Sequence, residues 1–263
     1  MKKMAFLPKT PITKVNLMDA EFDFPESATP EKSYAIVTYA RTGSYMLCEK
    51  LWRTGQMGAP FEYFNHFNLM LQMINRLHAD SIQGYVEKLF KVRTSPNGVF
   101  GMKLFPEHLQ FMHLASIVWL FPNLKFIYLT RKDILAQTVS LTRAMQTSQW
   151  SNYDVPQGEA TYDYKALIYN LGRIEKAMLF WEGYFKNKNI QPYRVTYENL
   201  VKQPDELTEK ILKHFGIEQD PKLAVELPLF EKQTYKNSFN WNERFNEDLK
   251  KYNPRIYEKY ATS

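Results

Sequence analysis

Short apolar runs alternate with longer segments of helical periodicity along most of the chain. The runs, rich in β-branched and aromatic residues, occupy positions 34–39, 98–105, 125–130 and 193–197. Each run is expected to be a strand, and each longer segment between them contains apolar residues at helical spacing. Strands that alternate with helices predict an α/β fold with a central, mainly parallel sheet covered by helices on both faces.

Four helical segments have recognisable ends. They are predicted over positions 43–55, 131–150, 163–185 and 204–216. Gly55 is a plausible C-terminal cap of the first, while Pro204 opens the last and Gly216 stops it. The later stretch at 232–245, KQTYKNSFNWNERF, is polar, aromatic and basic, and its pattern is too irregular to predict a long helix. We expect it to be a loop that could close over a nucleotide.

Composition favours one packed domain. The 263 residues are 44% hydrophobic, which excludes a disordered chain, and residues 33–263 are expected to form the domain behind an extended arm, residues 1–32. The net charge of +6 suits an anionic ligand, but a merely solvated basic surface fits it equally well, so it does not indicate nucleic-acid binding.

The number of cysteines and the N-terminal sequence both bear on the cellular location of the protein. A single cysteine, Cys48, excludes an intramolecular disulfide and suggests a reducing compartment, where it would pack within a helix. The N-terminus lacks the apolar core of a signal peptide, and no run approaches membrane-spanning length. We therefore expect a cytoplasmic, soluble protein without stable membrane insertion.

The first chemical signal is the segment ARTGS at positions 40–44, between the first strand and the first helix. Backbone amides from Thr42 to Met46 at a helix start can bind a phosphate or sulfate, and Arg41 adds a fork of donors. The hydroxyls of Thr42 and Ser44 can cap the helix or contact the anion. A Walker A sequence is absent. Taken alone, the segment fits a plain strand–turn–helix connection equally well.

A second signal is Arg131, at the end of the third strand, followed by Ser140 on the next helix. In an open parallel sheet, ligands bind beyond the carboxyl ends of the strands, so Arg41 and Arg131 are both expected at the ligand edge. Two cations there indicate more than one anionic group. The alternative is that Arg131 pairs with Asp133 in a surface charge cluster.

Together these pieces, in this order, resemble the PAPS-dependent sulfotransferases. The stretch ARTGSYMLCEKLWRTGQMGAPFEYFN resembles the mycobacterial trehalose sulfotransferase family, and FGMKLF, RKDILAQTVSLTRAMQTSQW and the spacing of Trp181 and Phe185 extend the match over roughly positions 34–245. The resemblance implies a three-layer, P-loop-like α/β enzyme. Its donor would be 3′-phosphoadenosine 5′-phosphosulfate (PAPS), and its acceptor a hydroxyl, on a carbohydrate or glycolipid.

The resemblance also implies roles for particular residues. The donor's 5′-phosphosulfate would lie on Arg41 and the loop that continues through Thr42, Gly43, Ser44, Tyr45 and Met46, and its 3′-phosphate on Arg131 and Ser140. Lys236 is a further candidate for the 3′-phosphate. Tyr197 and Trp150 are candidates for lining the nucleotide or acceptor pocket by stacking, although large aromatics are more often core residues.

Two residues compete as the base that accepts the acceptor's proton. Glu62 is favoured because the resembling family has its proposed catalytic glutamate in this motif, and burial among aromatics would raise its pKa. The alternative for Glu62 is an exposed acid near Pro60. His108 follows a strand as the histidine of cytosolic sulfotransferases does, yet such a histidine often only flanks a helix start. Lys103 could face the sulfonate or flank the sheet.

Other functions predict different chemistry. No metal is expected, because the five histidines show no ligand-like clustering. A non-catalytic nucleotide- or glycan-binding module would keep the anion loop without turnover, and a P-loop-like kinase would need the missing Walker lysine. The resembling family includes dimers, so a homodimer is possible.

Overall fold

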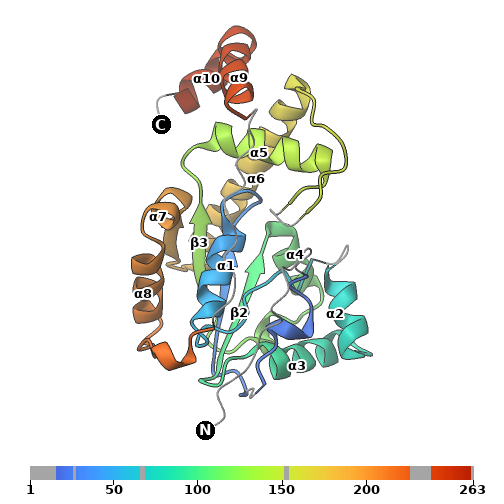
Figure 1. Cartoon of the computed structure of the whole chain (residues 1–263), viewed down its shortest axis with the longest axis vertical. Coiled ribbons are helices and arrows are strands. Elements are labelled where there is room, and N and C mark those ends of the chain that lie inside the picture. Colours follow the sequence, from blue (N-terminus) through green and yellow to red (C-terminus); the bar gives the residue numbers. More distant parts are fainter. Residues whose placement is uncertain (1–15, 26–27, 66–68, 151–153, 226–237, 262–263) are drawn as a thin grey trace.

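A parallel sheet forms the centre of the protein. The computed structural model describes residues 16–25, 28–65, 69–150, 154–225 and 238–261 (Figure 1). Within these ranges the sheet has four strands in the order β2-β1-β3-β4, and every neighbouring pair is parallel. The strands are β1 (Lys32–Val37), β2 (Val99–Leu104), β3 (Lys125–Thr130) and β4 (Tyr193–Thr196). All four predicted strands are confirmed.

Helices follow the strands in the alternation that the sequence predicts. Helices of three residues are η1 (Ala20–Phe22), η2 (Val118–Leu120) and η3 (Pro221–Leu223). The longer helices of the described ranges are α1 (Ser44–Arg53), α2 (Leu69–Leu77), α3 (Ile82–Arg93), α4 (Pro106–Leu114), α5 (Ile134–Thr147), α6 (Tyr164–Lys188), α7 (Tyr197–Lys202), α8 (Pro204–His214), α9 (Ser238–Tyr252) and α10 (Pro254–Ala261).

Burial on both faces explains why the strands are continuously apolar. From Tyr34 to Val37, β1 has no exposed surface, and β2 is buried along its whole length. A parallel sheet needs helices on its faces, because its crossover connections lie there. Helix α1 packs beside α8, and α4 contacts both β2 and α6. The predicted α/β fold, with a mainly parallel sheet flanked by helices, is confirmed.

Helix α6 joins two hydrophobic clusters. Its C-terminal half contributes Trp181 and Phe185 to the cluster around the sheet, and its N-terminal half contributes Leu167 and Leu171 to a second cluster. The second cluster also contains residues of α5 and α9, which lie with α10 at one end of the molecule (Figure 1). The indole Nε1 of Trp181 donates to the carbonyl of Thr38 at 3.0 Å, so α6 also supports the end of β1.

The prediction for the stretch at 232–245 is wrong where the structure describes it. From Ser238 onward the chain is α9, a helix of 15 residues, while Lys236 and the rest of 232–237 lie outside the described residues. Trp241, Phe245 and Leu249 recur at helical spacing and are buried in the second cluster. The helical spacing of these three residues is recognised only when the sequence window extends beyond position 245, because many polar residues surround Trp241 and Phe245.

The predicted ends of α1 and α8 and the predicted packing of Cys48 within a helix are confirmed. Gly55 and Gly216, each with φ of 67°, follow the ends of α1 and α8. Cys48 is a free, buried cysteine within α1. Residues 16–25, within the expected N-terminal arm, pack on the domain, with Met18 and Phe22 buried. Among the helices of the described ranges, none has both the length and the apolar character that crossing a membrane requires.

Candidate active site

The loop between β1 and α1 is held by hydroxyl groups at the end of the sheet. The Thr38 hydroxyl donates to the carbonyl of Leu129 on β3 at 2.7 Å. It also forms a hydrogen bond of 2.7 Å with the hydroxyl of Thr42. These bonds fix the start of the loop to the neighbouring strand. Thr38, which lies one position beyond β1, was not among the predicted site residues.

The loop turns sharply before α1 begins. Arg41 has φ of 69° and Gly43 has φ of 77°, a conformation that costs a side-chain-bearing residue free energy. A Cβ atom on Gly43 would lie 2.7 Å from Cδ2 of Tyr197. Helix α1 starts at Ser44 immediately after this turn, so the amides of its first turn lack helical acceptors. The predicted residues 42–46 therefore form a helix start suited to an anion.

The structure brings the predicted donor-binding cations together. Arg41 Nε donates to the Ser140 hydroxyl at 2.9 Å, and its Nη1 donates to the carbonyl of Trp150 at 2.6 Å. Arg131 Nη1 donates to the carbonyl of Arg41 at 3.4 Å. The two guanidinium groups and Ser140 thus share one edge of the sheet, as the sequence predicts. Trp150 is 40% exposed, and its main chain, not its ring, makes the contact with Arg41.

Arg131 stacks on an aromatic ring and does not form the alternative surface charge cluster. Its guanidinium carbon lies 4.7 Å from the centroid of the Tyr197 ring, at the start of α7. Asp133 instead caps α5, accepting from the amide of Ala136 at 2.8 Å. Tyr197 therefore touches both the turn at Gly43 and the Arg131 side chain.

Glu62 and Lys103 form a buried ion pair on the other side of the loop. Lys103 Nζ lies 2.5 Å from Glu62 Oε1, and the side chains are 2% and 8% exposed. The same ammonium donates to the Ser44 hydroxyl at 3.4 Å and lies 3.8 Å from the centroid of the Tyr45 ring. Asn65 Nδ2 donates to Glu62 Oε2 at 3.0 Å. The predicted base, a buried lysine and the helix start therefore converge.

The expected rise in the pKa of Glu62 is wrong. Burial alone would raise the pKa of this carboxyl, but the charges of Lys103 and His108 and the hydrogen bonds from Lys103 and Asn65 outweigh it and lower the pKa below 4.5. The carboxylate in turn raises the pKa of Lys103 above its ordinary value, despite burial. The sequence shows the aromatic surroundings of Glu62 but not the lysine, which comes from a strand 41 positions later.

His108 lies near this pair but is engaged elsewhere. Its Nδ1 accepts from the amide of Phe105 at 3.2 Å, at the start of α4, and its ring stacks on the Phe105 ring with centroids 5.1 Å apart. The imidazole is 3% exposed. This geometry favours the alternative in which His108 only caps the start of α4.

Sequence reasoning missed residues whose role depends on spatial neighbours. Asn65 follows Glu62 by three positions, a spacing that signals a local side-chain contact in the FEYFN segment. Gln137 on α5 donates to the carbonyl of Ala40 at 2.8 Å and so supports the loop from the far side. No motif marks Gln137, because its contact crosses 97 positions of sequence.

Comparison with known proteins identifies the family. The model of the Stf0 sulphotransferase family matches residues 33–248. Trehalose 2-sulfotransferase of Mycolicibacterium smegmatis is 26% identical over 261 residues, covering 83% of this chain and 96% of the relative. The protein of the same name from Mycobacterium tuberculosis is 26% identical over 254 residues, covering 81% of this chain and 94% of the relative.

Among solved structures, a sulfotransferase from Alicyclobacillus acidocaldarius is similar at a TM-score of 0.48 and 14% identity, covering 87% of this chain and 96% of that chain. A similarity of this size assigns no residue roles. The family match spans the sheet, the loop at Arg41 and the Glu62–Lys103 pair. The chain belongs to the Stf0 sulphotransferase family and is a sulfotransferase enzyme.

Proposed function

We propose that the protein transfers the sulfuryl group of PAPS to a hydroxyl of a carbohydrate or glycolipid. The observation that carries the proposal is the buried Glu62–Lys103 pair, in which Lys103 also reaches Ser44 at the start of α1. A base, a cation and an anion-binding helix start are the three elements that sulfuryl transfer requires. The names of the two mycobacterial relatives favour a sugar acceptor.

The donor would lie along the edge of the sheet that carries Arg41 and Arg131. We assign its 3′-phosphate to Arg131 and Ser140, and its 5′-phosphosulfate to Arg41 and the amides of residues 42–46. The contacts of Arg41 with Ser140 and the Trp150 carbonyl would be exchanged for the donor's anionic oxygens. We also assign Tyr197 to the lining of this site, which its contact with Arg131 supports, and Lys236 stays a sequence prediction.

In the reaction, Glu62 takes the proton from the acceptor hydroxyl while the acceptor oxygen attacks sulfur. A new S–O bond forms, and the S–O bond to the donor's 5′-phosphate breaks. Its electron pair stays on the phosphate oxygen, where the α1 amides and Lys103 stabilise the negative charge. The products are a sulfate ester and 3′,5′-bisphosphoadenosine (PAP). Arg41 acts only as an electrostatic clamp, because a guanidinium stays protonated.

Lys103 links donor binding to the strength of the base. In the structure its full charge faces Glu62 and lowers the pKa of that carboxyl. An incoming sulfuryl group would share the same ammonium, since Ser44 at the loop is within 3.4 Å of Lys103 Nζ. Once the ammonium of Lys103 is shared with the donor, it stabilises the Glu62 carboxylate less. The carboxylate therefore becomes a stronger base when the donor is present.

The direct test is turnover of labelled PAPS with a panel of acceptors that includes trehalose, other glycans and glycolipids. We expect label to move to at least one sugar hydroxyl and PAP to bind in calorimetry. No transfer to any acceptor, together with no binding of PAP, would contradict the proposal. The predicted cytoplasmic location, possible homodimer and lack of a nucleic-acid partner stay predictions.

The role of Glu62 is tested by Glu62→Gln. We expect turnover per PAP-binding site to fall by about 10²-fold or more while PAP affinity changes little, because the general base is lost and the donor edge is intact. The variant leaves Lys103 buried without a counter-charge, which destabilises by about 3–5 kcal/mol.

The double variant Glu62→Gln/Lys103→Met is the matched control for stability. It removes both buried charges, so the free energy of unfolding should recover while turnover stays low. Turnover of either variant at the wild-type rate rules Glu62 out as the base.

A further inference from the structure

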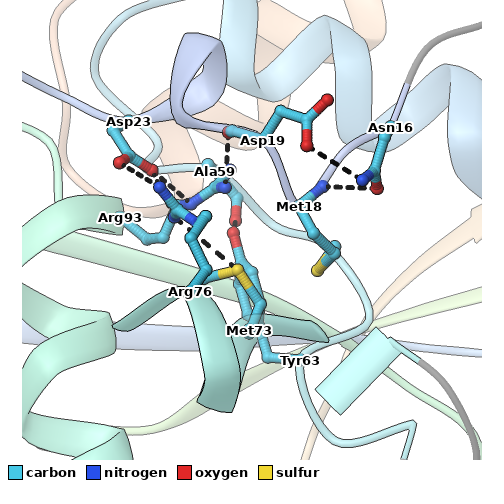
Figure 2. Close-up of polar contacts among 9 residues, drawn as sticks. All are labelled: Asn16, Met18, Asp19, Asp23, Ala59, Tyr63, Met73, Arg76 and Arg93. Carbon is cyan, nitrogen blue, oxygen red and sulfur yellow. Dashed lines mark hydrogen bonds and ion pairs between the residues drawn. The ribbon is translucent and has the colours of Figure 1, made fainter. Parts of the chain in front are cut away.

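A buried arginine lies directly behind the loop that carries Glu62. Arg93, the last residue of α3, has a side chain with no exposed surface. Its Nε lies 3.0 Å from Oδ1 of Asp23, and Asp23 also forms a two-pronged ion pair with Arg76 of α2, at 2.7 and 2.9 Å. Figure 2 shows Asp23 between these two guanidinium groups. A buried guanidinium needs such a counter-charge, because desolvation without one is costly.

Asp23 belongs to a segment near the N-terminus, residues 16–25, which we call the clamp segment. Arg93 Nη2 donates to the carbonyl of Asp19 at 3.0 Å, and the amide of Phe24 donates to the carbonyl of Val92 at 2.8 Å. The clamp segment is thus bound to the end of α3 through both main chain and side chains, and Figure 2 shows the contacts of Arg93 with Asp19 and Asp23.

Arg93 also contacts the loop that carries Glu62. Its carbonyl accepts from the amide of Ala59 at 3.2 Å, and its guanidinium carbon lies 5.9 Å and 5.7 Å from the ring centroids of Phe61 and Tyr63. These rings flank Glu62 in sequence. The Tyr63 hydroxyl donates back to the carbonyl of Ala59, which closes the loop on itself (Figure 2).

The opposite side of the loop is bonded to β2, so the loop is held from two sides. The amide of Lys103 donates to the carbonyl of Phe61 at 2.8 Å, which places Lys103 beside Glu62. Phe22 of the clamp segment adds ring contacts, with centroids 5.4 Å from Phe61 and 5.0 Å from Trp52 of α1. Apolar and ionic contacts of the clamp segment therefore meet on the residue next to Glu62.

We infer that the clamp segment positions the catalytic loop, with Asp23 and Arg93 as positioning residues for Glu62. Asp23 neutralises Arg93, and Arg93 then holds the Phe61 and Tyr63 rings and the Ala59 amide in one arrangement. Neither residue touches the Glu62 carboxylate, so both act through the loop. The catalytic consequence rests on the proposed role of Glu62, but the mechanical part does not.

Hydrogen exchange of the full chain tests the mechanical part without any turnover. In Asp23→Asn we expect peptides covering residues 57–65 to exchange at least about tenfold faster than in the wild type, and peptides covering 38–47 to be unchanged. Glu182→Gln, which breaks the exposed Glu182–Arg194 pair, is the control and should change neither region. Unchanged exchange of 57–65 in Asp23→Asn overturns the inference.

Kinetics test the consequence for catalysis. Turnover per PAP-binding site should fall about tenfold or more in Asp23→Asn, because small misplacements of a reacting group carry large rate penalties. PAP affinity should stay within about twofold, since the donor edge lies elsewhere, and Asp23→Glu, which keeps the charge, should retain more turnover than Asp23→Asn.

Faster exchange with full turnover overturns the positioning role. If exchange is faster in Asp23→Asn but the wild-type protein transfers no sulfuryl group to any acceptor, the proposed function is contradicted. The mechanical role of the clamp segment is then still supported. If Asp23→Asn does not fold, Phe22→Leu tests the clamp segment through its ring contact with Phe61, without a buried unpaired charge. It should also speed exchange of 57–65, and unchanged exchange there overturns the inference.

Discussion

Glu62 shows how one buried neighbour sets the chemistry of a carboxyl group. The apolar rings around it favour the neutral acid, yet Lys103 at 2.5 Å holds it ionised. An ionised carboxylate is the form that accepts a proton, which the proposed role of Glu62 as the base requires. The same pairing makes the carboxylate a weaker base than it would be without Lys103.

The pH dependence of kcat/KM tests the ionisation state of Glu62, because it reports the pKa values of the free enzyme. In the proposed mechanism protonation of Glu62 removes the base, and the charges of Lys103 and His108 hold the pKa of Glu62 below its ordinary value despite burial. Between about pH 6 and pH 8 we therefore expect no fall in kcat/KM toward the acid side. An acid limb near neutral pH that disappears in Glu62→Gln would show that the carboxyl has a raised pKa instead.

At the residue scale, the sequence placed several candidate residues near one another but did not show their partners. Arg41 and Arg131 were predicted from the positions where strands end and Ser140 from the helix that follows, and the structure brings the three together. The pairing of Glu62 with Lys103 was not predicted, because it joins a loop to a separate strand. The pKa of a side chain depends on the charges that surround it in space, and the position of a motif in the sequence does not reveal those charges.

Among the elements, the turn into α1 leaves no room for a side chain at Gly43. At Gly43 a side chain would combine φ of 77° with a contact of 2.7 Å to Tyr197. We expect Gly43→Ala to lower stability by about 1–3 kcal/mol and to weaken PAP binding, because the loop must move away from Tyr197.

Gly172→Ala is the control for this substitution, since its Cβ would meet nothing within 4 Å inside α6. Alanine there should be neutral or stabilise by about 0.5–1 kcal/mol, as expected for a helix interior. Thermal unfolding and calorimetry with PAP measure both variants. Equal effects of the two substitutions would mean that the turn tolerates a side chain.

Helix α9 occupies a stretch for which the sequence predicted a loop. Phe245 of α9 is completely buried against α5 and α6 in the second cluster. Phe245→Ala should therefore lower the free energy of unfolding by about 3–5 kcal/mol in urea titrations.

Leu179→Ala on α6 is the control for Phe245→Ala, because that leucine is 72% exposed. It should change stability by less than about 0.5 kcal/mol. If Phe245→Ala is equally mild, α9 does not dock as the structure places it.

For the whole molecule, the net charge of +6 attracts anions of any kind, whereas the donor site needs cations at defined positions. PAP affinity should fall as salt rises from about 0.05 to 0.5 M, because screening shortens the reach of these charges. Arg131→Gln should weaken PAP binding and flatten this salt dependence.

Lys210→Gln removes the same charge from α8, where Lys210 is paired with Glu206 on the surface. It should leave both PAP affinity and salt slope unchanged. Equal effects of the two variants, measured by calorimetry at several salt concentrations, would assign binding to the overall field and not to the sheet edge.

The sequence by itself determined the strands, the four helices with recognisable ends, the loop at Arg41 and the family, because periodicity, turn residues and motif order are local properties. Only the tertiary structure decided that Lys103 neutralises Glu62, that Arg93 and Asp23 brace the loop from behind, and that α9 is a buried helix. These features join segments that are far apart along the chain. Their energies come from burial and charge pairing, which exist only once those segments have packed together.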